Sequence, residues 1–272
     1  MKKTLIYAGL VFAGLWIINR VYGIVAALVV LIIVIAALMW KRRATILTQM
    51  AAQAYYIKGN AEKGEKLYKA AYKTGLMTPE CKIAYSSFCL RENNFDKGRS
   101  LLNEVINSSR STKKEKLNAK HNLSVLLWKE GNLEEALQIL EQVHEKQPAT
   151  DTYGTLGVLY LEKAKKDKSY SDILDFMLEA YEYNDSDKTI ADNLGETYLC
   201  MEEYEKAKKV YEELLKTQHI TPMPYYNYGL VLKNMGDTDS AREQFEKALT
   251  CRFTSVLTVT KEMIQQEILN LG

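Results

Sequence analysis

The feature that most constrains the fold is a small residue that recurs at a regular interval through most of the chain. It stands at Ala52, Ser86, Ser124, Gly157, Gly195 and Gly229. The interval is 34 residues from Ala52 to Ser86 and again from Gly195 to Gly229. A period of this length predicts a stack of similar supersecondary units, because each unit buries its apolar face only against its neighbours.

Other residue types recur with the small residue. The fullest copy has Leu194-Gly195, Tyr198, Ala207 and Tyr211, and the next copy has Tyr228-Gly229, Leu232, Ala241 and Phe245. This pattern resembles the tetratricopeptide repeat family, in which each unit is one pair of helices. The resemblance covers residues 45–255 and implies an all-α, right-handed solenoid with a concave face that binds protein segments.

Boundaries of the units follow from the same pattern. The resemblance implies helix pairs at residues 45–78, 79–112, 117–149, 150–187, 188–221 and 222–255. The small residue is expected to let the second helix of its own pair approach closely. Turns are predicted seven residues later, at Gly59-Asn60, Asn93-Asn94, Gly131-Asn132, Glu202-Glu203 and Gly236-Asp237. Gly and Asn favour such sites because they tolerate left-handed backbone conformations.

Two intervals between units are 38 residues long, which places extra residues in two polar stretches, 108–116 and 165–172. Both are predicted to be lengthened surface loops. After the sixth unit, apolar residues recur among polar ones from Val256 to Leu271. Residues 256–272 are therefore predicted to form a helix that caps the solenoid.

The N-terminal part is of a different kind. Residues 1–43 contain six basic and no acidic residues, and the runs 4–18 and 21–40 are apolar or neutral, with Asn19 and Arg20 between them. A helix that spans a bilayer needs roughly 20 apolar residues. Because Arg20 is costly at mid-membrane, residues 1–43 are predicted to be a transmembrane helical hairpin with its turn at Asn19 and Arg20.

The orientation of this anchor follows from its charges. Lys2 and Lys3 precede the first run, and Lys41, Arg42 and Arg43 follow the second. The positive-inside bias places both groups, and the repeat array with them, in the cytoplasm. A composition rich in Lys and Tyr indicates a bacterial source, so the membrane is expected to be a bacterial cell membrane. The alternative for run 4–18 is a cleavable signal peptide, although no small-residue cleavage site precedes the second run.

Charge and motifs exclude several classes of function. Without its first six basic residues, the chain has 30 Lys and Arg against 34 Asp and Glu, a formal charge of −4 for residues 44–272 that argues against a nucleic-acid partner. The four cysteines form no C-x-x-C pair, so a metal knuckle is not indicated and reduced, buried thiols are expected. The three histidines are scattered, and no nucleotide-binding or hydrolase motif occurs. We therefore expect no enzymatic activity and no cofactor.

By family analogy, the groove is lined by first-helix residues on either side of the small position. The predicted groove residues are Asn118, His121, Val125, Trp128, Val158, Asp192, Glu196, Tyr226 and Leu230. Asp192 and Glu196, one helical turn apart, would place two carboxylates on one face, so a ligand with a basic, partly apolar segment would fit. The alternatives are a solvated face for these carboxylates, packing between repeats for Trp128 and a hydrogen-bonded helix position for His121.

Two hypotheses for function follow. In the first, the chain is a membrane-tethered, non-catalytic adaptor that binds a peptide or helix of a protein partner in its groove, and the bilayer raises the effective concentration of that partner. In the second, it is a structural subunit of a membrane complex that assembles through its spanning helices, where Gly9 and Gly14 allow close packing. The sequence carries no signal for an oligomeric state.

Overall fold

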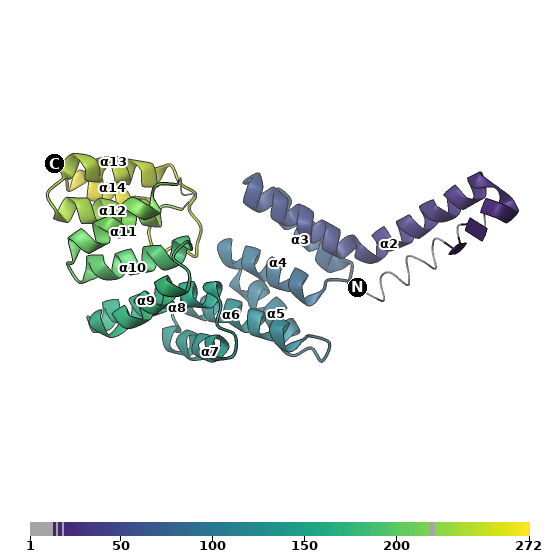
Figure 1. Cartoon of the computed structure of the whole chain (residues 1–272), viewed down its shortest axis with the longest axis horizontal. Coiled ribbons are helices and arrows are strands. Elements are labelled where there is room, and N and C mark those ends of the chain that lie inside the picture. Colours follow the sequence, from purple (N-terminus) through teal and green to yellow (C-terminus); the bar gives the residue numbers. More distant parts are fainter. Residues whose placement is uncertain (1–12, 15, 18, 218–220) are drawn as a thin grey trace. The chain divides into compact units, whose positions relative to one another are not determined.

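The computed structural model describes residues 13, 14, 16, 17, 19–217 and 221–272. Every regular element among these residues is a helix, which confirms the all-α prediction. The chain divides into two compact units, residues 1–84 and 85–272 (Figure 1).

The first unit contains α2 (Ile24–Ala52), a π-helical turn η1 (Gln53–Ile57), α3 (Ala61–Lys73) and the start of α4 (Pro79–Arg91). Gly23, with φ of 86°, interrupts the helix before α2, whereas Asn19 and Arg20 are themselves helical. The predicted turn at Asn19 and Arg20 is therefore misplaced, because Gly adopts positive φ without steric cost and these two residues do not need to. Most of run 4–18 lies outside the described residues, so the hairpin stays a prediction.

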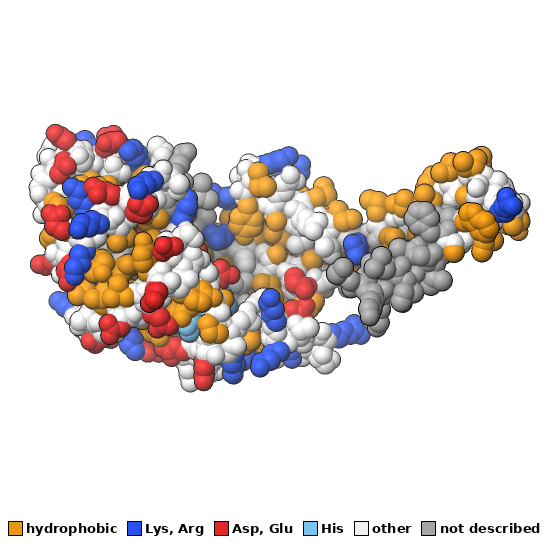
Figure 2. Space-filling model, in the orientation of Figure 1, with side chains coloured by type: hydrophobic (Ala, Val, Ile, Leu, Met, Phe, Trp, Pro, Cys, Tyr) orange, Lys and Arg blue, Asp and Glu red, His pale blue; other side chains and the backbone are white. Residues whose placement is uncertain are grey.

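The segment Ile24–Ile57 is the one helix among the described residues that is long and apolar enough to cross a bilayer. Its most apolar window has a mean hydropathy of 2.8 and is not buried inside the protein. Figure 2 shows hydrophobic side chains over this exposed helix. Length and composition alone support the span, and core helices and signal sequences can share both properties. The anchor accordingly remains a prediction.

The same helix continues without a break into the first helix pair. Ala44, Thr48 and Ala51 are buried, at spacings of four and three residues that place them on one face. They pack against α3, whose buried residues include Tyr68 and Ala71. One helix thus has an exposed apolar part and a part that contributes to the core of the first unit.

In the second unit, helix pairs follow one another from the end of α4. The elements are α5 (Phe95–Ile106), α6 (Lys113–Lys129), α7 (Leu133–Lys146), α8 (Thr150–Asp167), α9 (Ser171–Tyr183), α10 (Lys188–Cys200), α11 (Tyr204–Leu214), α12 (Met223–Asn234), α13 (Thr238–Leu249) and α14 (Lys261–Leu269). Consecutive helices pack together, and α6, α8, α10 and α12 also pack in series. This second set of contacts places the first helices of neighbouring pairs side by side, as in a solenoid (Figure 1).

Two of the small residues, Gly195 and Gly229, have the predicted role. A Cβ on Gly195 would lie 2.7 Å from the Tyr211 ring, and one on Gly229 would lie 2.5 Å from the Phe245 ring. Tyr211 and Phe245 belong to the second helix of the same pair and are fully buried. At Gly157 the nearest group is instead Asn193 of the next pair, 2.3 Å away. The small position therefore admits a neighbouring helix in each case.

The five predicted turns are confirmed, and each contains one residue with a left-handed backbone. These residues are Gly59, Asn93, Gly131, Glu202 and Gly236, with φ from 59° to 90°. Asn60, Asn94 and Asp237 then cap the following helix by accepting a hydrogen bond from a backbone N–H. Local chemistry therefore ends one helix and begins the next.

Three expectations about connections need correction. Residues 108–112 form a loop as predicted, but 113–116 already belong to α6. In the second stretch, residues 165–167 extend α8 to Asp167, where Lys168 ends that helix with φ of 53°, and residues 171 and 172 already belong to α9. The capping helix begins at Lys261 instead of residue 256, because Thr260 is its N-cap and accepts a hydrogen bond from the Met263 N–H. Residues 250–260 form a non-helical loop, which we call the clasp.

Candidate functional site

A cavity of about 330 Å³ lies in the second unit, and we call it the central cavity. Its walls come from α6, α8 and α10, from the end of α4 and the start of α12, and from the clasp. The first helices of successive pairs face it because they pack in series. The cavity therefore occupies the face on which the sequence predicts a groove.

Five of the nine predicted groove residues line the central cavity. They are Val125, Trp128, Val158, Asp192 and Glu196. The first three supply apolar surface from α6 and α8, and the last two supply carboxylates from α10. The structure thus combines apolar and acidic side chains in one cavity, and their role in binding stays a prediction.

The other four predicted groove residues lie outside this lining. Asn118 is exposed on α6, and the Nε2 atom of His121 lies 2.8 Å from the Thr155 hydroxyl on α8. Burial lowers the pKa of His121, although the charge of Asp151 opposes this shift. Tyr226 is 8% exposed and packs on Phe245, with 5.9 Å between ring centroids, and Leu230 packs against the same core cluster. His121 therefore links α6 to α8, and Tyr226 links α12 to α13.

The carboxylates of the central cavity form a buried polar network. The Asn227 amide donates to Asp192 Oδ1 at 3.2 Å and to Glu196 Oε2 at 3.4 Å. Lys165 Nζ lies 2.7 Å from Glu196 Oε1 and 3.0 Å from Glu162 Oε1. Burial raises the pKa of Asp192 to about 7, and the charge of Glu196 adds to the shift. A cationic group beside Asp192 would stabilise its charged form.

Sequence reasoning missed Lys165 and Asn227. Lys165 falls in a stretch predicted as a loop, whereas the extended α8 carries it to the central cavity. Asn227 stands two residues before the small residue Gly229, and Asn193 stands two before Gly195. The Asn193 amide donates to the Gly154 carbonyl of the preceding first helix at 2.8 Å. This recurring asparagine was the available signal for a hydrogen bond between repeats.

That position links first helices elsewhere in the unit as well. Asn122, two residues before Ser124, donates to the Ser87 hydroxyl at 2.8 Å. Thr155, two before Gly157, is the residue that pairs with His121. Buried polar groups need such partners, so these bonds hold successive first helices in register along the cavity wall.

The clasp touches helix ends on the far side of the central cavity. The Ser255 hydroxyl donates to the Leu90 carbonyl at 2.6 Å, and the Ser255 N–H donates to the Arg91 carbonyl at 3.5 Å. Lys129 Nζ donates to the Leu257 carbonyl at 3.4 Å. Burial lowers the pKa of Lys129 to about 8, although Glu162 opposes the shift, and its Nζ lies 3.9 Å from the Trp128 ring centroid.

The described residues include no group of three or more His, Cys, Asp or Glu side chains that could hold a metal ion. None of the four cysteines forms a disulfide: Cys81 and Cys89 are buried, as expected, while Cys200 and Cys251 are half-buried. The network of Asp192, Glu196 and Lys165 offers hydrogen bonds and charge. This network is therefore suited to binding a polar or charged group of a ligand.

Comparison with protein-family models matches three segments of the chain to tetratricopeptide repeats. The segments are residues 117–147, 190–220 and 224–252. Over these three segments the chain is similar to the tetratricopeptide repeat family. The matched repeats coincide with α6 and α7, α10 and α11, and α12 and α13, so the count of six repeats stays a prediction for the remaining pairs.

Solved structures show the same fold. The chain is similar to TTC0263, a thermophilic TPR protein of Thermus thermophilus, with a TM-score of 0.58 and 15% identity over 71% of this chain and 98% of that one. It is also similar to Pseudomonas aeruginosa pilF, with a TM-score of 0.55 and 13% identity over 84% of this chain and 98% of that one. Comparison with curated protein sequences finds no match. At these identities the likeness concerns the fold alone.

Proposed function

We propose that the protein is a non-catalytic scaffold, held at a membrane by residues 1–43, whose repeat array binds a segment of a protein partner in the central cavity. The repeat fold itself is that of a protein-interaction scaffold. The observation that supports the site is the combination of apolar residues with buried carboxylates on the inner helices.

The lining indicates the chemistry of the partner. Val125 and Val158 are half-buried on α6 and α8 and offer apolar contact. Asp192 accepts a hydrogen bond from the Asn227 amide, whereas Lys165 forms its ion pair with the neighbouring Glu196. A partner segment with an aliphatic side chain and a Lys or Arg would fill the apolar part and pair with Asp192. We expect recognition to depend on these two contacts because they lie at the centre of a buried site.

The tether is proposed from α2. Its residues before Lys41 are mostly exposed and apolar, and the Arg43 guanidinium lies 4.2 Å from the ring centroid of Trp40. Tryptophan and basic residues at the end of an apolar helix favour the interface of a bilayer. The basic cluster Lys41–Arg43 favours a cytoplasmic location for the array, at a bacterial cell membrane.

The experiment is affinity capture from solubilised membranes with the tagged full chain, followed by mass spectrometry. The cavity variant carries Val125→Lys and Val158→Lys, which add bulk and positive charge to the lining. Its matched control carries Gln138→Lys and Gln142→Lys on α7, where both side chains are exposed. A partner that the control retains and the cavity variant loses supports the proposal.

A partner that both variants retain would contradict binding in the central cavity. A third variant, with residues 1–43 replaced by an unrelated spanning helix, then distinguishes the second hypothesis. Loss of the partner from this variant alone would indicate a membrane-complex subunit that assembles through α2, whose exposed apolar surface is free to pack in the described structure.

A further inference from the structure

We propose that the clasp is an intramolecular ligand of the central cavity, and that the partner displaces it with a non-helical segment of like chemistry: two adjacent aliphatic residues flanked by hydroxyl side chains. The inference rests on the proposed function, because it assumes that a partner binds in this cavity. It adds the class of partner and the means by which access is controlled.

The length of the clasp is the first observation. It joins α13, which ends at Leu249, to α14, which begins at Lys261, through 11 residues. The turn between α6 and α7 takes three residues, 130–132, and helix connections in bundles commonly take 2 to 8. Since α14 packs directly on α13, a short turn would reach it. The additional residues therefore serve a purpose other than connection.

The second observation is where the clasp goes. Ser255 is 165 residues from Leu90, whose carbonyl accepts its hydroxyl hydrogen bond. Leu90 and Arg91 end α4, and the last carbonyls of a helix have no partner inside it. Lys129, at the end of α6, reaches the Leu257 carbonyl. The clasp thus binds helix ends of two other pairs, as a docked ligand would.

The third observation is that the clasp forms part of the cavity wall. Val256, Leu257 and Thr258 line the cavity together with apolar residues such as Trp128 and Val158. A turn joins the Leu257 N–H to the Thr254 carbonyl at 3.1 Å and contains the aliphatic pair. The sequence Ser-Val-Leu-Thr is therefore a segment that this face of the unit already holds.

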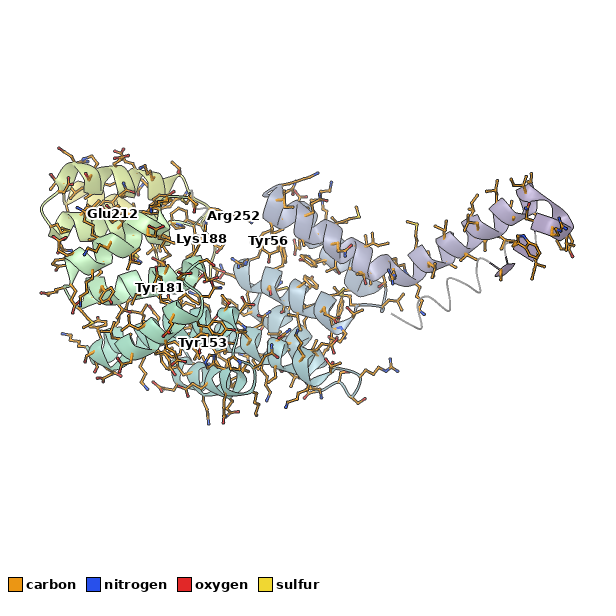
Figure 3. The ribbon with its side chains drawn as sticks, in the orientation of Figure 1. Tyr56, Tyr153, Tyr181, Lys188, Glu212 and Arg252 are labelled. Atoms are coloured by element: carbon orange, nitrogen blue, oxygen red, sulfur yellow. The ribbon has the colours of Figure 1, made fainter. Side chains whose placement is uncertain are left out.

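Most of the clasp is less deeply buried than the residues that follow it. Residues 251–258 are all half-buried, whereas Val259 and Ile264 are 5% and 0% exposed. Lys233 on α12 also holds Glu267 of α14, at 2.6 Å. Residues 254–258 can therefore leave the cavity while α14 stays in place. Figure 3 labels Arg252 on the clasp and Lys188 at the start of α10.

A free partner competes with a tethered ligand, whose effective concentration reaches the millimolar range for a short connection. The part of the cavity near Asp192 gives the partner an advantage. The clasp contributes only Val256, Leu257 and Thr258 to the lining and no cation. A partner that adds a basic side chain beside Asp192 gains an ion pair that Val256, Leu257 and Thr258 cannot make.

The test uses the full chain in detergent and a fluorescein-labelled peptide of residues 250–261, with Ser in place of Cys251. In the clasp variant, residues 254–258 are replaced by Gly-Ser-Gly-Ser-Gly. Fluorescence anisotropy should show binding to the clasp variant and at least tenfold weaker binding to the wild type, whose own clasp already holds this position. A control peptide with Val256→Asp and Leu257→Asp should bind neither protein.

Absence of peptide binding to a clasp variant that keeps its helical circular dichroism would overturn the inference. If that variant does not fold, the double variant Ser255→Ala and Leu257→Ala replaces it, with the same expected order of affinities. Equal binding to wild type and variant would also overturn it. Loss of a partner from the Val125→Lys and Val158→Lys chain, without peptide binding, would refute the clasp alone and leave the proposed function standing.

Discussion

Replacing Gly195 with Ala should destabilise the second unit, whereas replacing Gly98 with Ala should stabilise it. The two glycines lie within helices, α10 and α5, and neither has a positive φ. In each case Ala gains about 1 kcal/mol in helix propensity. Their surroundings differ, so the sign of the total effect should differ as well.

The magnitude follows from the contacts of the added Cβ. At Gly195 it would lie 2.7 and 2.8 Å from two carbons of the Tyr211 ring. Carbon atoms pack at about 3.5 to 4.0 Å, so the ring would have to retreat by about 1 Å. Tyr211 is fully buried, and its hydroxyl donates to the Asp192 carbonyl at 3.3 Å. Overpacking costs about 1 to 3 kcal/mol; near the upper end, the net loss is about 2 kcal/mol after the helical gain.

At Gly98 the nearest atoms, from Cys89 and Leu126, are 3.6 Å away, an ordinary contact. Nothing there opposes the gain of about 1 kcal/mol. Urea unfolding of the full chain in mild detergent, followed by far-ultraviolet circular dichroism, should show a lower midpoint for Gly195→Ala and a higher one for Gly98→Ala. Midpoints that rise for both variants would refute the claim that close approach of Tyr211 requires Gly195.

Three further predictions use the same unfolding assay. Glu202→Gly should raise the free energy of unfolding by roughly 0.5 kcal/mol, and the midpoint with it, since Glu202 has a φ of 61° that L-residues adopt at a cost of about 1 kcal/mol and the greater chain entropy of Gly offsets part of this gain; an unchanged or lower midpoint would contradict this. Asn193→Ala should cost about 1 to 2 kcal/mol because it removes the buried hydrogen bond to the Gly154 carbonyl, and the half-buried Asn122→Ala should cost less. Burial raises the pKa of Asp192 to about 7, above its usual ~3.9, so the contribution of Asp192 to stability is greatest below pH 4 and falls as the pH rises to 7; Asp192→Asn should gain stability over wild type at pH 8 and lose that advantage at pH 4, and an equal difference at both values would exclude a raised pKa.

The helix pairs could be predicted because their signals are local. Gly195 and Tyr211 belong to one unit, and the need for a small residue opposite a large one repeats at Gly229 and Phe245. The turns likewise depend on single residues, such as Gly131 and Gly236, that tolerate a left-handed backbone. The residue pattern and its period were therefore enough to predict these helix pairs and turns.

The clasp could not be predicted because its conformation depends on distant contacts. Val256, Leu257 and Val259 fit the apolar face of a helix that continues to Met263. In the structure, the preceding Ser255 binds the end of α4, and the helix begins only after Thr260. Lys165 was missed for a related reason, since it begins a Lys-rich stretch that is typical of a loop, although α8 continues to Asp167. Neither the contact of Ser255 with α4 nor the extension of α8 has a counterpart in the repeat pattern.

The uninterrupted course of α2 has a mechanical consequence. From Trp40 to Ala51 the helix runs about 16 Å without a joint, so residues 24–40 and the first helix pair would move as one lever. If residues 24–40 span a bilayer, a change in its thickness would alter their tilt, and the same angle would be imposed on Ala44, Thr48 and Ala51. The first pair would then sense the physical state of the membrane.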